Sequence, residues 1–203
     1  MNTNIENLVL QLFEIGAVKF GSFELKSGII SPIYIDLRVI VSYPKVLGVV
    51  ADLMWNKIAD YDFDIICGVP YTALPMATAI SLKYGKPMVM RRKEAKDYGT
   101  KKIIEGHFLA KQKCLIIEDL ITSGMSIFET IEPLEREGLL VKDIVVLLNR
   151  EQGGEENLES KGYHLTSVLS MTELLNILLE QNKIDEKTFA EINNFIKQNQ
   201  IKK

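Results

Sequence analysis

The chain has 203 residues, of which 47% are hydrophobic and 25% are charged, and this balance is typical of one soluble globular domain and excludes a disordered or fibrous protein. A net charge of −3 gives no overall basic field for non-specific nucleic-acid binding. The N-terminus lacks the pattern of a leader, and no stretch of about 18 apolar residues could span a membrane. We therefore predict a cytoplasmic protein that binds neither nucleic acid nor membrane.

Cysteine and histidine usage argues against zinc and against disulfides. Cys67 and Cys114 both fall within apolar runs, where they are expected to be buried thiols, and the two histidines, His107 and His164, complete no metal-ligand spacing with them.

The N-terminal residues predict a helix, short strands and a second helix. Apolar residues recur at helical spacing from Ile5 to Ile15, and Gly16 follows as a stop signal. Residues 20–40 are interrupted by glycine and proline, which favours short strands with turns. Residues 43–61 are again helical, with Pro44 near the first turn, where a missing N–H costs little.

From residue 63 onward, strands and helices alternate. Four short apolar runs, each expected to be buried on both faces, are separated by helical segments at 72–85 and 126–138; the runs are residues 63–69, 86–92, 113–119 and 143–150. This alternation predicts an α/β fold with a mainly parallel sheet flanked by helices. Residues 163–171 add a candidate strand, and two helices are expected after residue 171. Residues 93–112 form a long polar segment that is expected to be irregular, as a lid or binding loop.

The most informative motif is "IIEDLITSGMS", residues 116–126. Glu118 and Asp119 end an apolar run, and small residues then lead into a predicted helix whose N-terminus can bind a phosphate. The candidate phosphate ligands are Thr122, Ser123, Gly124, Met125 and Ser126. Because carboxylates repel phosphate, Glu118 and Asp119 must serve another part of the same ligand, such as a pair of hydroxyls or a cation. The alternative is a polar strand end followed by an ordinary helix cap.

Three other strand ends carry candidate site residues, since ligands of open α/β sheets bind at the carboxyl ends of strands. "GVPYTALP" presents Tyr71 and Thr72 in a rigid loop, although a plain strand-to-helix turn is as good an interpretation. The stretch "RRKEAKDYGTKK", which follows another strand, is rich in basic residues. It could bind a polyanion, or it could be an ordinary solvated loop. Its cations are Arg91, Arg92, Lys93, Lys96, Lys101 and Lys102. "LLNREQGG" places Arg150 after a strand, where it could bind a planar carboxylate or lie in a surface turn. The usual fingerprints of nucleotide-binding loops, GxxxxGK[ST] and GxGxxG, do not occur in the sequence.

Together these residues resemble the type I phosphoribosyltransferases, whose fingerprint is two acidic residues followed by Thr-Ser-Gly. "LKSGIISPIYIDLR", "GVPYTALP", "RRKEAKDYGTKKIIEG" and "LLNREQGG" are similar, more narrowly, to orotate phosphoribosyltransferases, in the form found as the first half of the bifunctional enzyme that makes UMP. The resemblance implies a single domain over 1–203, with a small hood from about 1–42, an α/β core from about 43–170 and C-terminal helices from about 171–203.

The resemblance also implies an activity: orotate and 5-phosphoribosyl-1-diphosphate give orotidine 5′-monophosphate and pyrophosphate, with Mg²⁺ held mainly by substrate and water rather than by protein ligands. A homodimer with shared active sites is implied, as is association with an orotidylate decarboxylase.

The residue roles below are those that the family implies for matching positions. Glu118 and Asp119 would bind the ribose hydroxyls, and Thr122 to Ser126 the 5′-phosphate. Tyr71, Thr72, Arg92, Lys93 and Lys96 would contact the diphosphate. Lys96, Lys93 and Asp119 would be the catalytic residues, with Lys96 stabilising the charge of the departing pyrophosphate. Lys26, Tyr34 and Arg150 would contact orotate, and Lys26 also the diphosphate. Tyr98 and Thr72 replace a histidine and a lysine of many bacterial relatives, so the roles of those positions stay open.

Two other functions remain open at this point. The acidic-plus-TSG motif is shared by phosphoribosyltransferases for other bases, and a non-catalytic regulator could keep the fold to sense the phosphoribosyl ligand. The acidic composition and the intact basic segment favour the enzyme over the regulator.

Overall fold

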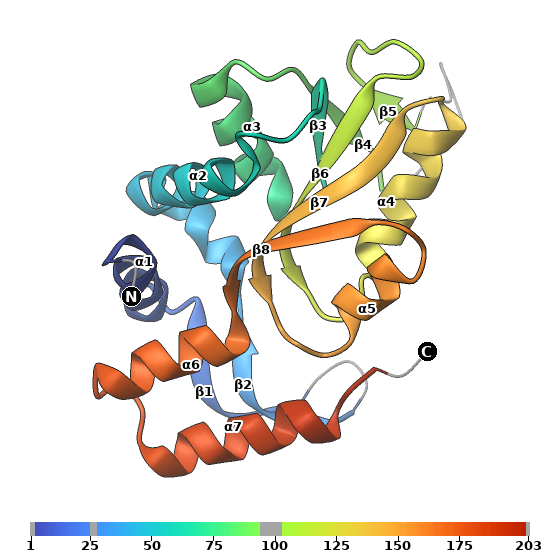
Figure 1. Cartoon of the computed structure of the whole chain (residues 1–203). Coiled ribbons are helices and arrows are strands. Elements are labelled where there is room, and N and C mark those ends of the chain that lie inside the picture. Colours follow the sequence, from blue (N-terminus) through green and yellow to red (C-terminus); the bar gives the residue numbers. More distant parts are fainter. Residues whose placement is uncertain (1–2, 25–27, 94–102, 202–203) are drawn as a thin grey trace.

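The computed structural model (Figure 1) describes residues 3–24, 28–93 and 103–201. Lys26, Lys96, Tyr98, Lys101 and Lys102, which the sequence analysis singled out, lie outside the described residues.

A six-stranded sheet forms the centre of the part that the structure describes. Its order is β5–β4–β3–β6–β7–β8, and all neighbours are parallel except β5, which runs antiparallel to β4. The strands are β3 (Ile65–Gly68), β4 (Met88–Arg91), β5 (Ile104–Glu105), β6 (Lys113–Ile121), β7 (Leu140–Asn149) and β8 (His164–Ser170). The predicted mainly parallel α/β architecture is confirmed.

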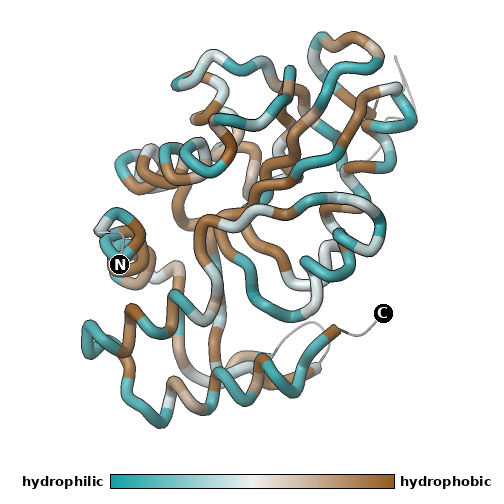
Figure 2. Tube along the Cα trace, in the orientation of Figure 1, coloured by the Kyte–Doolittle hydropathy of each residue, from teal (hydrophilic) through white to brown (hydrophobic). Residues whose placement is uncertain are grey.

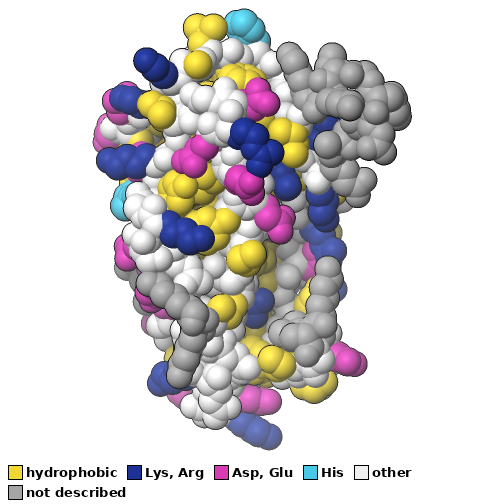
Figure 3. Space-filling view, turned by 90° about the vertical axis from the view of Figure 1, so that its right-hand side faces the viewer, with side chains coloured by type: hydrophobic (Ala, Val, Ile, Leu, Met, Phe, Trp, Pro, Cys, Tyr) yellow, Lys and Arg dark blue, Asp and Glu magenta, His cyan; other side chains and the backbone are white. Residues whose placement is uncertain are grey.

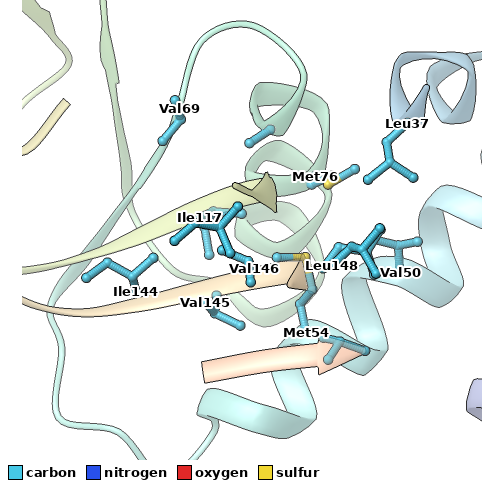
Figure 4. Close-up of a cluster of buried hydrophobic side chains, with 14 of the residues drawn as sticks. Leu37, Val50, Met54, Val69, Met76, Ile117, Ile144, Val145, Val146 and Leu148 are labelled. Carbon is cyan, nitrogen blue, oxygen red and sulfur yellow. The ribbon is translucent and has the colours of Figure 1, made fainter. Parts of the chain in front are cut away.

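Helices cover both faces of this sheet (Figure 1). Helices α2 (Pro44–Ile58) and α3 (Ala73–Tyr84) pack on one face, and α4 (Met125–Arg136) and α5 (Gly154–Glu159) lie on the other. Two covered faces require strands that are apolar on both sides, and Figure 2 shows hydrophobic residues concentrated in these strands. Figure 4 shows the resulting core between the sheet and α2 and α3, with Val50, Met54, Met76, Ile117, Val146 and Leu148 among its buried side chains.

The N-terminal segment and the C-terminal helices pack together beside the carboxyl ends of the strands (Figure 1). Strands β1 (Val18–Glu24) and β2 (Ile30–Ile35) form a separate antiparallel pair, which the short 3₁₀ helix η1 (Leu37–Ser42) connects to α2. The N-terminal helix α1 (Thr3–Glu14) contacts α6 (Met171–Glu180), and α7 (Glu186–Gln198) contacts β2. These contacts put the C-terminal helices on the hairpin that faces the strand ends.

Most predicted elements are confirmed, with local exceptions. Helix α1 ends before Gly16, whose φ is 73°, and Pro44 occupies the first turn of α2. Cys67 and Cys114 are buried free thiols, and burial raises the pKa of Cys67 to about 12.

The expectation that residues 93–112 are irregular throughout was wrong at β5, and β4 is not buried on both faces, because Met90 is 45% exposed. The sequence analysis did not predict η1 or α5.

A long apolar helix is needed to cross a membrane, and a basic surface is needed to bind nucleic acid. No helix in the described ranges combines the length and the apolar character needed to cross a membrane. On the face shown in Figure 3, basic and acidic side chains are interspersed with apolar ones. That face therefore presents no continuous basic surface within the described part of the chain.

Candidate active site

Strand β6, the loop after it and helix α4 form the predicted strand–loop–helix junction. The strand ends at Ile121, residues 122–124 form the loop, and α4 begins at Met125. Gly124 precedes the helix with φ of 84°, a left-handed conformation that glycine adopts without the steric cost of a Cβ. The first N–H groups of a helix have no partner within it, so this junction offers donors and a favourable dipole to an anion.

Glu118 lies beneath this loop and is engaged by it. The residue is only 4% exposed. Its Oε2 accepts a hydrogen bond of 2.8 Å from Ser126 Oγ, and its Oε1 accepts one of 3.0 Å from the Asp119 backbone N–H. Burial, together with the hydrogen bond and charge of Asp119, raises the pKa of Glu118 well above its ordinary value. The carboxyl group of Glu118 thus connects the end of β6 to the first turn of α4.

Asp119 is half-buried and lies more open to the site than Glu118. Burial raises the pKa of Asp119, and the positive charge of Arg38 is among the effects that oppose this rise. Arg38, on η1, also donates to Asp36 Oδ1 at 2.6 Å and to the hydroxyl of Tyr34 at 3.0 Å. The structure therefore adds Arg38 to the site, a residue that the sequence analysis missed.

Arg150 follows β7, the strand next to β6. Its backbone N–H donates to Ile121 O at 3.0 Å, which ties it to the end of β6. Its Nε is buried and has no hydrogen-bond partner among the described residues, and burial lowers the pKa of its guanidinium. Partial burial of a cation without a counter-charge has an energetic cost. An anionic group bound beside residues 122–124 would offset this cost.

Helix α5 fixes the phosphate loop from the other side. Asn157 Nδ2 donates to Ser123 O at 3.1 Å. A Cβ at Gly154 would lie 2.6 Å from Ile121 Cγ1 and 2.7 Å from Thr122 O, so only glycine allows α5 to approach this closely. Asn157 is a second residue that the sequence analysis missed, because its role depends on a six-residue helix without a clear apolar period.

The basic segment begins beside Tyr71. Lys93 Nζ lies 5.7 Å from the centroid of the Tyr71 ring, and that tyrosine is 67% exposed. Thr72, which precedes α3, is half-buried. Arg92 forms an ion pair with Glu105 of β5, with Nη2 and Oε1 2.5 Å apart, so a diphosphate would have to share or displace that partner.

The structure brings some of the predicted site residues into one network and leaves others apart. Glu118, Asp119 and Ser126 are linked through hydrogen bonds, and Arg150 joins them through Ile121. Tyr34 belongs to the hairpin, where its ring centroid lies 5.4 Å from that of Phe23. Arg38 donates a hydrogen bond to the Tyr34 hydroxyl, and its positive charge acts on Asp119.

Two of the surface hollows differ in their relation to this network. One, of about 720 Å³, lies around the starts of β6, β7 and β8 and is lined by Lys113, Leu140 and His164 among others, so it belongs to the opposite edge of the sheet. A smaller one, of about 190 Å³, is lined mainly by apolar side chains of η1, α2 and α3 and includes Tyr71 and Thr72. The smaller hollow is therefore continuous with the candidate site.

The chain belongs to the phosphoribosyl transferase domain family, whose model matches residues 39–168. It is 49% identical over 195 residues to uridine 5′-monophosphate synthase of Bos taurus, an alignment that covers 95% of this chain and 41% of the bovine protein. It is also 43% identical over 187 residues to orotate phosphoribosyltransferase of Chlamydia caviae, with 91% of each chain covered. The solved structure of Leishmania donovani UMP synthase superposes with a TM-score of 0.88 at 38% identity, over 95% of this chain and 42% of that one. The chain thus spans about two fifths of the UMP synthases it matches and nearly all of the chlamydial protein.

Proposed function

We propose that this chain is an orotate phosphoribosyltransferase, which transfers the 5-phosphoribosyl group from 5-phosphoribosyl-1-diphosphate to orotate in UMP biosynthesis. The observation that carries this proposal is the pairing of an acidic strand end and a phosphate-type loop on β6 with a half-buried arginine at the end of β7, whose Nε has no hydrogen-bond partner among the described residues. The chlamydial relative, similar over 91% of each chain, bears the same name.

The 5′-phosphate would bind at the loop of residues 122–126. Backbone N–H groups at the start of α4, including that of Ser126, and the hydroxyls of Thr122 and Ser123 supply donors there, while the Ser126 hydroxyl donates to Glu118. Asp119, with Glu118 behind it, would accept hydrogen bonds from the ribose hydroxyls. This division gives the carboxylates a ligand part that they attract, and it keeps them from the phosphate that they would repel.

The diphosphate would bind the basic segment and the loop before α3. Lys93 near Tyr71, and Arg92 after exchange of its Glu105 partner, are suited to its negative charge. Lys26 and Lys96, which lie outside the described residues, take their roles only from the family resemblance, as does the contact from Thr72.

Orotate would bind between Arg150 and Tyr34. Orotate carries a carboxylate on a planar ring, and an arginine fork matches a planar carboxylate. The positive charge of Arg150 would gain a counter-charge only when this substrate is present. Tyr34 offers an aromatic ring on the hairpin side.

The chemistry requires positioning and electrostatic stabilisation rather than a covalent nucleophile. Cleavage at the anomeric carbon builds positive charge on the ribose and negative charge on the departing pyrophosphate, while a ring nitrogen of orotate attacks. The Glu118–Asp119 pair lies on the ribose side of this charge separation, and the basic residues lie on the pyrophosphate side. Exclusion of water from the site would prevent hydrolysis of the cationic sugar.

Mg²⁺ suits this site as a partner of the substrate. Magnesium is commonly bound by substrate phosphates, water and one or two carboxylates, and within the described ranges no three acidic, histidine or cysteine side chains gather to form a cage. The ion would neutralise charge on the diphosphate, and the chain would hold it through the substrate.

We also propose that two copies of this chain form a homodimer in the cytoplasm. The apolar hollow beside the site and the exposed Val41, Tyr43 and Tyr71 support a self-association surface on η1 and the loop before α3. A reducing compartment suits the two free cysteines. Association with an orotidylate decarboxylase takes its support from the family resemblance, together with the greater length of relatives named uridine 5′-monophosphate synthase.

Incubation of the purified chain with orotate, 5-phosphoribosyl-1-diphosphate and Mg²⁺ tests the function. We expect loss of orotate absorbance with stoichiometric release of pyrophosphate. Uracil, adenine, hypoxanthine and guanine serve as alternative bases in parallel reactions. Turnover of one of these bases without turnover of orotate would refute orotate as the substrate. Absence of turnover with every base would refute the proposed phosphoribosyltransferase activity.

A further inference from the structure

The C-terminal residues Asn199–Ile201, here called the C-terminal strap, are hydrogen-bonded to the loop that follows β7. Ile201 N–H donates to Gln152 O at 3.0 Å, Gln152 Nε2 donates to Asn199 O at 3.0 Å, and Gln200 Nε2 donates to Glu151 O at 2.8 Å. Figure 1 shows the chain leaving α7 toward α5. Residues nearly fifty positions apart in sequence are thus joined by three hydrogen bonds.

The fit between the strap and the loop is close. A Cβ at Gly153 would lie 2.6 Å from Ile201 O, and Gly153 has φ of 96°. The side chain of Gln152 is buried, with 5% exposure, although it belongs to a polar loop. These contacts show that the strap packs closely against one side of the loop.

The loop has an unusual conformation that needs such support. Glu151 adopts φ of 57°, which is rare for a residue with a side chain. Its N–H donates to Asn149 Oδ1 at 2.8 Å, and its carboxylate accepts from Thr172 N and Oγ1 at 2.6 and 2.7 Å. The strap adds a donor to the carbonyl of the same residue, so Glu151 is held by β7, α6 and the strap together.

Arg150 lies directly before this loop. It has no side-chain ion pair among the described residues, and its Nε has no partner. The Arg150 backbone N–H donates to Ile121 O, and residues 151–153 follow Arg150 directly, so a shift of these residues would move its side chain. The loop of residues 122–124 has contacts of its own, a hydrogen bond from Asn157 Nδ2 to Ser123 O and the close approach of Gly154 to Thr122 O, and none of the three strap hydrogen bonds is among them.

We propose that the C-terminal strap is a positioning element for Arg150. By holding residues 151–153, it sets where the guanidinium meets the carboxylate of the base substrate, and it has little effect on the phosphoribosyl ligand. This inference rests on the proposed function and deepens it, since it assigns base affinity to three residues beyond the last helix.

The double variant Gln200→Ala/Ile201→Pro tests this role in the full chain. It removes two donors to the loop, because proline has no N–H. We expect KM for orotate to rise on the order of 10-fold, as two lost hydrogen bonds allow, while kcat and KM for 5-phosphoribosyl-1-diphosphate change by less than about 2-fold. A residue that only stabilises the fold would not produce this split between the two substrates.

Two matched variants control for the substitutions. Gln200→Ala/Ile201→Val restores the N–H at position 201 and should recover part of the orotate affinity. Gln181→Ala removes a glutamine that donates to Glu6 at 2.7 Å, away from the loop, and should leave both KM values unchanged. If the double variant fails to fold, Gln200→Ala alone gives the same test with a smaller expected rise in KM.

An unchanged KM for orotate in the folded variants, or equal increases for both substrates, would overturn the positioning role. The proposed function fails in a different way, through absence of orotate turnover in the unmodified chain. The two failures are therefore distinguishable in one set of assays.

Discussion

Ser126 Oγ donates a 2.8 Å hydrogen bond to Glu118 Oε2 and so connects the first turn of α4 to a carboxyl group buried at the end of β6. This bond joins the two parts of the motif that the sequence presents as separate: the acidic pair and the phosphate-type loop. Glu118 therefore supports the loop, and its buried position gives it a structural role that Asp119 does not share.

Loss of the Ser126 hydroxyl should affect both affinity and stability. In Ser126→Ala the buried Glu118 loses a donor, which costs roughly 1–3 kcal/mol of unfolding free energy, and the phosphate loop loses a hydroxyl. We expect KM for 5-phosphoribosyl-1-diphosphate to rise on the order of 10-fold, with a smaller change for orotate. Ser81→Ala, which removes a hydroxyl bonded to Lys86 O, is the control. Equal KM values for 5-phosphoribosyl-1-diphosphate in the two variants would contradict a role of the Ser126 hydroxyl in the loop.

The raised pKa of Glu118 predicts a particular pH dependence of stability. Above the ordinary carboxyl pKa of 4.5, the unfolded chain loses this proton while the folded chain retains it. The unfolded state then binds fewer protons, so the free energy of unfolding falls as pH rises. Glu118→Gln removes this titration, and its stability relative to the unmodified chain should increase between about pH 4 and pH 7.

Urea unfolding at several pH values measures this difference, with Glu129→Gln as an exposed control on α4. A difference between Glu118→Gln and the unmodified chain that does not change with pH would contradict the raised pKa.

Two glycine-to-alanine changes should have opposite effects. At Gly154 the new Cβ would overlap Ile121 and the carbonyl of Thr122, so we expect a loss of about 2 kcal/mol of stability and strongly reduced turnover. At Gly48, within α2, a Cβ meets nothing within 4 Å, and alanine should stabilise the helix by roughly 0.5–1 kcal/mol. Thermal unfolding and steady-state kinetics test both, and a destabilised Gly48→Ala or a neutral Gly154→Ala would count against the packing argument.

Arg150→Met should separate stability from activity. Removal of a half-buried cation that has no protein counter-charge should leave the melting temperature unchanged or raise it. The kcat/KM for orotate should fall by about 100-fold or more, because the substrate carboxylate loses its partner. Arg136→Met, which breaks an exposed i,i+4 pair with Glu132, should alter neither quantity appreciably. Retained orotate affinity in Arg150→Met would exclude this residue from the base site.

The proposed dimer surface can be tested with two exposed apolar residues. Val41 is 58% exposed and lines the hollow beside the site, whereas Leu82 is 82% exposed and does not line it. Val41→Glu should shift the chain toward the monomer in sedimentation velocity, and Leu82→Glu should not. The reverse pattern would place the interface elsewhere.

Sequence patterns predicted the parts of the fold and site that local chemistry determines. Runs of apolar residues predicted the parallel strands, and the small residues after Asp119 predicted the strand–loop–helix junction between β6 and α4. Arg38, Asn157 and the C-terminal strap were not predicted, because each acts on residues distant in the chain: Arg38 on Asp119, Asn157 on Ser123, and Gln200 on Glu151. The two-residue strand β5 was missed because its pairing with β4 leaves no periodic signal.

The pairing of β4 with β5 has a consequence for the basic segment between them. Arg92 N–H donates to Ile103 O at 2.8 Å, and the Arg92 side chain pairs with Glu105, so the ends of the intervening chain are already held together. The ends of this segment are therefore joined in the absence of substrate, so substrate binding does not have to supply the entropy cost of bringing them together. Since doubling a loop adds only about 0.6 kcal/mol to its closure cost, homologous enzymes can vary the length of this segment without unfolding its stem.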